Sequence, residues 1–321
     1  MYYTLFFICI LTRIATSIYY IEDIDSLRFA YSVADEYSIK NLQPHFPGYP
    51  IFSFIGKLIY LFTGNLGLSF SLIGGIALFI IIISSLKLTN MKINSKNGMI
   101  LTSFILLNPM FWLMSNRYMP DLLGLACTIT VICLLISTNS NFSKFVGFFL
   151  AGILIGLRLS YFPILLAPIF YIIKRSYNLK FLISFTIGIL MWLIPLIYIE
   201  GFISLYNSAY KHTIGHFFDF GGSIITESNI FLRLKYLAIT VWSDGLGLFY
   251  SGRSWLTILP TIPIIFLTFQ LITNYKLILK QKGTKWLLIS MIIYIIWILL
   301  SQNLIYKSRH VLPLILFIII F

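Results

Sequence analysis

Charged residues are scarce in this chain. Of its 321 residues, 10% are Asp, Glu, Lys or Arg, whereas soluble globular domains carry about 25%. Hydrophobic residues make up 59% of the chain. Apolar runs long enough to cross a bilayer core recur from end to end, and no polar stretch is long enough to fold separately. The composition excludes a soluble enzyme or a nucleic-acid-binding domain, and it predicts an all-α polytopic membrane protein with a single domain over residues 1–321.

Cysteine is also rare, with three residues in the chain. Cys127 and Cys133 lie in one apolar run, where a helix would point them to different faces, and Cys9 lies in another. Neither a disulfide framework nor a metal-binding cysteine cluster is expected, and no cofactor is predicted. The first apolar run has no basic segment before it and no small-residue cleavage motif after it, which indicates an uncleaved first span.

The apolar runs predict a bundle of about ten transmembrane helices. The run 143–173 is too long for one straight span, and its interruption RLSYFP, with Arg158 and Pro163, predicts a break into two short helices. The stretch 50–63 is short and follows a proline cluster, so it is expected to lie along the membrane interface. The final run is short, and the chain is expected to stop inside a helix. The predicted spans are 2–20, 66–87, 98–115, 120–138, 143–157, 161–174, 180–199, 254–273, 285–301 and 311 onward.

The loops between these spans are segregated by charge. With the break at RLSYFP, one side of the membrane receives KLTNMKINSK, NSNFSK, KRSYNLK and NYKLILKQKGTK, which are rich in Lys and contain no acid. The chain's 10 Asp and Glu all fall on the other side. Basic loops stay in the cytoplasm by the positive-inside rule, so the acids are expected to face the periplasm, the cell exterior or an organelle lumen. That outer side also holds many Lys and Arg, which an anionic ligand at this membrane face would explain.

The first outer loop combines acids, a histidine and prolines. It reads IEDIDSLRFAYSVADEYSIKNLQPHFPGYPIF, a pattern that predicts an amphipathic helix over 24–38 followed by an irregular proline-rich turn. Acids at the start of a helix are favoured by its N-terminal dipole, so helix capping is one interpretation of Asp23 and Asp25. The other interpretation is a chemical role at the membrane surface, with His45 close behind them in the chain.

Several short motifs resemble the GT-C superfamily of membrane glycosyltransferases. They are DSLRFAYSV, QPHFPGYPIF, SNRYMPDLLGLA, GLRLSYFPILLAP and SRHVLPLIL, spread over residues 20 to 320. Within the superfamily, the chain looks most similar to the enzymes related to protein O-mannosyltransferases and to the aminoarabinose transferase of lipid A. The resemblance implies a hexosyl- or mannosyltransferase-like enzyme of the cell membrane, with a sugar on a polyprenyl or dolichyl phosphate as donor. It also implies a catalytic acid in the first outer loop, on the extracytoplasmic side.

Carried over position by position, the resemblance assigns the catalytic acid to Asp25, with Asp23 as the competing choice. Ser26 stands where members commonly carry the second acid of an Asp-Glu pair, which leaves one carboxylate as the base and weakens the case for a bound metal. A second outer acid of the family corresponds to Asp121, which could contact the acceptor. An ion pair with the nearby Arg117, or a helix cap, is the structural alternative for Asp121.

Sugar transfer from a lipid phosphate requires a base and several cations. The base takes the proton of the acceptor hydroxyl, and the cations stabilise the charge that builds up on the phosphate. The candidates for phosphate binding are Arg309, Arg158, His45 and Lys57. The two arginines are favoured, because each lies at the outer end of a span and a guanidinium matches the geometry of a phosphate. Snorkelling towards the interface is their structural alternative.

Two further polar features lie inside or near the membrane, a pair of histidines and a single arginine. His212 and His216 are four positions apart with Asp219 beyond, a spacing that could hold a divalent cation on a helix. The glutamate of the zinc hydrolase motif is missing, however, and no metal is predicted. Arg13 lies within the first span, so it must find a partner in the bundle or snorkel outward.

Two other classes of membrane protein share some of these features. A secondary transporter would carry ionisable residues in several spans and a repeated half-structure, and apart from Arg13 neither pattern is found. A polyprenyl-phosphate-linked glycan flippase or polymerase would also handle a lipid phosphate with outer arginines, and it stays open as the alternative function. The expected partners are the lipid-linked donor, the bilayer and an acceptor that is a protein, a lipid or a glycan.

Overall fold

The protein is built from helices. The computed structural model describes residues 1–321 except 177, 274–282 and 305–306, and no β-strand occurs among the described residues. Most of the predicted cytoplasmic loop NYKLILKQKGTK therefore lies outside the described residues. The α-helices are α1 (Tyr2–Ala15), α2 (Ile24–Ala34), α3 (Pro50–Thr63), α4 (Leu66–Leu88), α5 (Lys96–Leu107), α6 (Pro109–Met114), α7 (Asp121–Ile136), α8 (Asn141–Arg158), α9 (Leu166–Arg175), α10 (Leu179–Glu200), α11 (Phe202–Ile214), α12 (Ile230–Ile239), α13 (Ile258–Thr273), α15 (Thr284–Ser301) and α16 (Leu312–Ile320).

Four helical stretches in the described part of the chain are long and apolar enough to cross a bilayer. They are Leu66–Leu88, Asn141–Arg175, Leu179–Glu200 and Thr284–Ser301. The other apolar helices, including α1, α3, α5 and α7, have 10–17 residues. The predicted all-helical integral membrane protein is confirmed, while the number of ten spans and the interfacial position of α3 stay predictions.

Helix α4 packs at the centre of the bundle, against α1, α3, α5 and α7. A Cβ at Gly74 of α4 would lie 1.7 Å from the carbonyl oxygen of Ser115, which follows α6. The two backbones therefore touch without a side chain between them, a close approach that only glycine permits.

The helical stretch Asn141–Arg175 folds back on itself. Helix α8 ends at Arg158, a short 3₁₀ turn follows over Leu159–Leu165, and α9 then begins. The next helix, α10, runs parallel to α8, because the Ser184 hydroxyl donates to the Phe145 carbonyl and the Trp192 indole donates to the Gly152 carbonyl. Because α8 and α10 run in the same direction, the chain between them must reverse its direction. The predicted break at RLSYFP is therefore present.

Three predicted helices are shorter in the structure than in the sequence analysis. The first span, predicted over 2–20, ends at Ala15. The other two are interrupted by local hydrogen bonds. The amphipathic helix predicted over 24–38 ends at Ala34, because Ser38 pairs its backbone with Gln43 in both directions and so leaves the helix. The span predicted over 98–115 is interrupted at Asn108, whose side chain caps α6 with Pro109 in its first position. In both cases a local hydrogen bond outweighs the apolar pattern.

Arg13 finds neutral partners within the bundle, as its place in an apolar helix requires. Its guanidinium donates to the Ser115 hydroxyl at 2.9 Å and to the Leu106 carbonyl at 3.0 Å. The same group lies 3.9 Å over the ring of Trp112. The charge is thus held between α1 and the α5–α6 corner and has a structural role.

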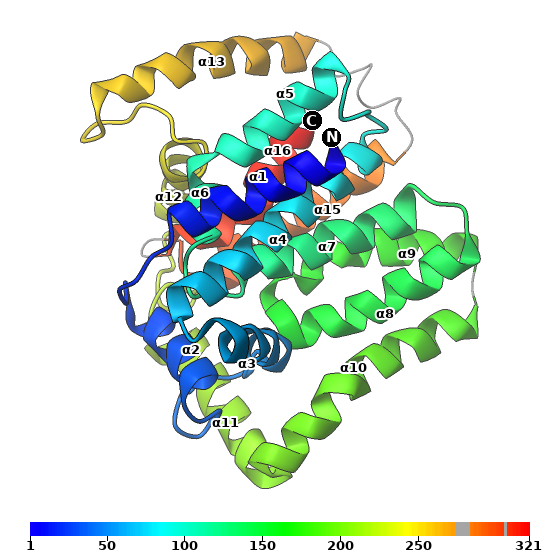
Figure 1. Ribbon diagram of the computed structural model, residues 1–321, viewed down its shortest axis with the longest axis vertical. Coiled ribbons are helices and arrows are strands. Elements are labelled where there is room, and N and C mark those ends of the chain that lie inside the picture. The colour runs from blue at the N-terminus through cyan, green and yellow to red at the C-terminus, as the bar shows by residue number, and fades with distance from the viewer. Residues whose placement is uncertain (177, 274–282, 305–306) are drawn as a thin grey trace.

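The elements of the first outer loop gather at one end of the bundle. Figure 1 shows α2, α3 and α11 together at the lower left, and the far ends of α4, α7 and α9 on the opposite side. Helix α4 spans 23 residues, so these two ends are separated by roughly 35 Å. The first outer loop and the base-rich loops KLTNMKINSK and NSNFSK therefore lie at opposite ends of the molecule.

A cysteine-labelling experiment tests this orientation in the membrane. In a variant lacking Cys9, Cys127 and Cys133, we expect single cysteines at Lys40 and Ser228 to react with an impermeant maleimide added outside. Cysteines at Asn94 and Asn139 should react only after the membrane is opened. All four positions are exposed, so failure to react reflects sidedness. Labelling of Ser228 and Asn139 from the same side would contradict the fold-back of Asn141–Arg175.

Candidate active site

Asp23 and Asp25 begin helix α2, and they have different roles there. Asp23 is the N-cap, and its side chain accepts a hydrogen bond of 2.7 Å from the backbone N–H of Ser26. Asp25 lies in the first turn and is 4% exposed, so its carboxylate points into the protein. The capping interpretation thus applies to Asp23 alone, and Asp25 needs another explanation for its burial.

Three cations surround the carboxylate of Asp25. Its Oδ2 accepts hydrogen bonds from Lys307 Nζ at 2.8 Å and from Arg309 at 2.6 Å. Its Oδ1 lies 3.4 Å from the guanidinium of Arg28, one helical turn along α2. Lys307 and Arg309 flank the start of a 3₁₀ turn, Ser308–Val311, which leads into α16. Residues from the two ends of the chain therefore form one ion-pair cluster.

A second buried carboxylate, Asp121, adjoins this cluster. It accepts a hydrogen bond of 2.7 Å from Arg158, and its Oδ1 lies 3.9 Å from Arg309 Nε. Gly124 makes this pair possible, because a Cβ there would lie 2.5 Å from the Cβ of Arg158. The tip of the α8–α9 hairpin is thereby pressed against the first turn of α7.

The structure does not show the ion pair between Asp121 and Arg117 that was one alternative for Asp121. Arg117 instead donates to Glu22 and, at 2.6 Å, to Asp23. It therefore ties the segment before α2 to the turn before α7. Proximity in the sequence suggested the wrong partner, because Asp121 points inward at the start of a helix while Arg117 lies in the preceding turn.

The proline-rich turn brings His45 and Tyr49 to the same place. His45 Nδ1 lies 3.9 Å from Asp25 Oδ1, and its Nε2 lies 3.3 Å from the Tyr49 hydroxyl. That hydroxyl also accepts a hydrogen bond of 3.2 Å from Arg158. Tyr49 has φ +45°, a left-handed conformation rare for residues with a side chain. It directly precedes Pro50 of α3, and this backbone turns the ring inward to link the two carboxylate clusters.

The structure does not bring Lys57 to these residues. Lys57 is exposed on α3, and its amine donates to the carbonyl of Asp35 at the end of α2. Asp35 lies ten residues beyond Asp25 on that helix, or about 15 Å along its axis. In the structure Lys57 links α3 to the end of α2, away from Asp25, and its role in phosphate binding stays a prediction.

Sequence reasoning missed Lys307, Tyr49 and Arg28, and it considered His212 only as a metal ligand. The signal for Lys307 was its position two residues before Arg309, in YKSRH, and the signal for Tyr49 was its place in QPHFPGYP. His212 of α11 stacks on His45, with ring centroids 5.3 Å apart. His216 follows at 6.4 Å and bonds to the carbonyl of Ser301. In the described part of the chain no three His, Cys, Asp or Glu residues form a cation-binding group.

The cations determine the ionisation of the acids. Burial alone would raise the pKa of Asp25, but the charges of Arg309 and Lys307 outweigh burial and hold that pKa far below its ordinary value. Burial also opposes ionisation of Asp23, and the Ser26 N–H together with Arg117 lowers its pKa. Burial lowers the pKa of His45 to about 3, against the attraction of Asp25. At neutral pH Asp23 and Asp25 are therefore ionised, and the imidazole of His45 is neutral.

Several polar atoms in this cluster still have hydrogen-bonding capacity. The buried atoms without a hydrogen-bond partner among the described residues include His45 Nδ1, Asp121 Oδ2, Arg158 Nε, Arg309 Nε and the Tyr161 hydroxyl. Unpaired buried polar atoms are unfavourable and mark places where a ligand or water is bound. Because four of the five can donate, and two belong to guanidinium groups, the cluster is suited to an anion with several oxygens.

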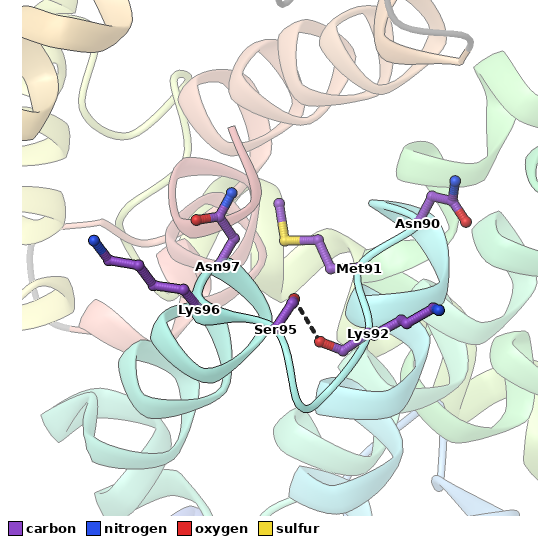
Figure 2. Close-up of a pocket in the computed structure, with 6 residues that line it drawn as sticks. All are labelled: Asn90, Met91, Lys92, Ser95, Lys96 and Asn97. Carbon is purple, nitrogen blue, oxygen red and sulfur yellow. Dashed lines mark hydrogen bonds between the residues drawn. The ribbon is translucent and has the colours of Figure 1, made fainter.

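A separate hollow lies at the other end of the bundle. Its volume is about 490 Å³, and it is formed by the loop between α4 and α5, with Asn90, Met91, Lys92, Ser95, Lys96 and Asn97 around it (Figure 2). The side chains in view include no acid. Helix α4 separates this hollow from the carboxylate cluster, so the two do not form one site.

The fold is shared with ArnT from Cupriavidus metallidurans, whose crystal structure contains bound undecaprenyl phosphate. The two structures superpose with a TM-score of 0.61 at 12% sequence identity, over 99% of this chain and 58% of ArnT. This chain thus spans a little over half the length of ArnT. No protein-family model and no curated protein sequence matches it. At this identity the likeness establishes the fold alone, an all-helical membrane-protein fold like that of ArnT.

Acid is expected to destabilise the cluster through its histidines. A histidine whose pKa falls on folding takes up its proton first in the unfolded chain, so its stabilising effect is complete above pH 6.5 and is lost as pH falls towards the folded value. For His45 that value is about 3, and for His212 burial lowers it to about 4. The melting temperature should therefore fall from pH 7 to pH 5.

The matched variant is His45→Gln, which keeps a hydrogen-bonding side chain but cannot be protonated. His45 accounts for about 2 kcal/mol of the loss at pH 5, so the variant should lose less stability than the parent over the same range. Thermal unfolding followed by tryptophan fluorescence in detergent measures both proteins. Identical pH dependence in parent and variant would show that His45 is not buried in its neutral form.

Proposed function

We propose that the protein is a glycosyltransferase that moves a sugar from a polyprenyl or dolichyl phosphate to an acceptor hydroxyl at the outer membrane face. The observation that carries this proposal is the buried carboxylate of Asp25 beside Lys307 and Arg309. One base and a set of cations are the groups that transfer from a lipid phosphate requires. The fold shared with ArnT, a protein that binds undecaprenyl phosphate, supports the same conclusion.

The proposed step is a displacement at the anomeric carbon. Asp25 takes the proton of the acceptor hydroxyl, and the acceptor oxygen forms a bond to the anomeric carbon. The bond between that carbon and the phosphate oxygen breaks, and its electron pair stays with the leaving lipid phosphate. Arg309 and Lys307 stabilise the negative charge that accumulates there, because both can donate to phosphate oxygens.

The other members of the cluster have supporting roles in this proposal. Arg158, held between Asp121 and Tyr49, adds a second guanidinium at the outer end of α8. His45 Nδ1 is free to bond to the donor. Asp121 keeps Arg158 in place, and Arg117 fixes the segment before α2 through Glu22 and Asp23. Helices α2 and α3 would lie along the interface over this site, within a bundle of about ten spans.

A transfer assay with purified protein tests the function directly. We expect release of polyprenyl phosphate from at least one member of a panel of polyprenyl-phosphate sugars, and none from nucleotide sugars. The assay follows the lipid product by chromatography, with heat-treated protein as the control. Turnover with a nucleotide sugar in the absence of lipid would contradict the proposal. Movement of an intact lipid-linked glycan across vesicles, without release of the lipid phosphate, would favour the flippase.

Asp25 and Asp23 form a matched pair for locating the base. Asp25→Asn preserves size and removes basicity, so it should lower the initial transfer rate by about 10² to 10⁴. Asp23→Asn should have a much smaller effect, because asparagine is also a good helix N-cap. Rates are compared at equal amounts of monodisperse protein. A parental rate for Asp25→Asn together with collapse of Asp23→Asn would move the base two residues upstream.

A further inference from the structure

Asp25 is a poor base in the arrangement that the structure shows. Its Oδ2 accepts hydrogen bonds from both Lys307 and Arg309, and its Oδ1 faces Arg28. A carboxylate so strongly paired attracts a proton weakly, and general-base catalysis weakens as the pKa of the base falls. The cations that hold Asp25 are the same groups that would bind the phosphate of a donor.

Lys307 and Arg309 can turn to another anion without leaving the site. Each amine or guanidinium has several donors, and only one of them is used in the hydrogen bond to Asp25. Arg309 Nε has no hydrogen-bond partner among the described residues. The side chain of Lys307 is 40% exposed and that of Arg309 is 9% exposed. One cation therefore lies at the rim and one inside, as contact with an incoming headgroup requires.

The net charge of the residues around Asp25 and Asp121 is opposite to that of a sugar phosphodiester donor. Around Asp25 and Asp121, five cations face four carboxylates in the described part of the chain, and His45 is neutral, so one positive charge is left. The residues are Arg28, Arg117, Arg158, Lys307 and Arg309, with Glu22, Asp23, Asp25 and Asp121.

A sugar phosphodiester carries one negative charge and neutralises this excess. Transfer moves one proton to Asp25 and one negative charge to the lipid phosphate, so the site stays neutral throughout. A buried cluster that is neutral with the donor bound and after transfer avoids the large free-energy cost of an uncompensated charge.

We propose that Asp25 and the donor phosphate compete for Lys307 and Arg309, so that Asp25 becomes an effective base only when the donor is bound. This inference rests on the proposed function. When the phosphate takes one or both cations, Asp25 loses their stabilising charge and its affinity for a proton rises. After transfer, protonated Asp25 releases its proton to solvent, regains Lys307 and Arg309, and displaces the lipid phosphate. The donor therefore binds before the acceptor is activated.

Competition between Asp25 and the donor phosphate predicts that removal of the Asp25 carboxylate strengthens phosphate binding. Asp25→Asn removes the competitor and frees both cations, so the inactive variant should bind polyprenyl phosphate about tenfold more tightly than the parent. The probe is polyprenyl phosphate in detergent micelles, titrated against purified full-length protein and followed by tryptophan fluorescence. Lys307→Gln, at the exposed rim, should weaken binding. Asp23→Asn is the matched control and should bind like the parent, because Asp23 lies 3.9 Å from Arg309 and mainly pairs with Arg117.

The outcomes separate this inference from the proposed function. Equal or weaker binding by Asp25→Asn, from a parent that transfers sugar, would overturn the competition and leave the function standing. A parent that does not bind polyprenyl phosphate would overturn both. Each variant is first compared with the parent in size-exclusion profile and melting temperature. If Asp25→Asn does not fold, Asp25→Ser carries the same expectation, because its hydroxyl also leaves both cations without a carboxylate.

Discussion

The pairing of Asp25 with Lys307 and Arg309 joins parts of the chain that are 282 and 284 residues apart. An ionised carboxylate buried beside a membrane is unfavourable unless cations compensate it, and here both partners come from the segment before the last helix. The first outer loop and the start of α16 must therefore meet for either to be stable. The α8–α9 hairpin, the proline-rich turn and α11 all pack around this contact, through Arg158, Tyr49 and His212.

Buried arginines elsewhere in the molecule differ from those around Asp25 in the partners of their guanidinium groups. Arg233 of α12 is fully buried. It donates to the carbonyl of Gly222 and to the carbonyls of Leu299 and Gln302 at the end of α15. Arg13 likewise has neutral partners. Carbonyl groups at a helix C-terminus satisfy a guanidinium and fix it as a structural cap. In the Asp25 cluster, the guanidinium groups of Arg158 and Arg309 keep unused donors.

Local signals allowed part of the site to be predicted from the sequence. The break at Arg158 and Pro163 follows from a charge and a proline in an apolar run, and the cap at Asp23 follows from its place before a helix. The positions of Lys57, away from Asp25, and of Arg158, beside Asp121, could not be predicted, because a sequence does not show which face of a helix points inward. Lys307 and Tyr49 lie beside recognised motif residues, but their partners, Asp25 and Arg158, come from distant parts of the chain, and neighbouring residues do not encode those contacts. The shared fold tests neither set of roles.

The hairpin of α8 and α9 constrains how the protein is made. Its 35 residues are apolar enough for one long helix, yet the chain reverses over Leu159–Leu165, directly after Arg158. If either half were inserted alone, the unpaired backbone of the connecting turn would be exposed to lipid. Insertion of the two helices as a unit avoids this exposure. Arg158 lies beside this turn, so its charge reaches the far side of the membrane only if the turn crosses the bilayer with it. Insertion of both halves as one unit would bring Arg158 to Asp121 and Tyr49 before the last helix is synthesised.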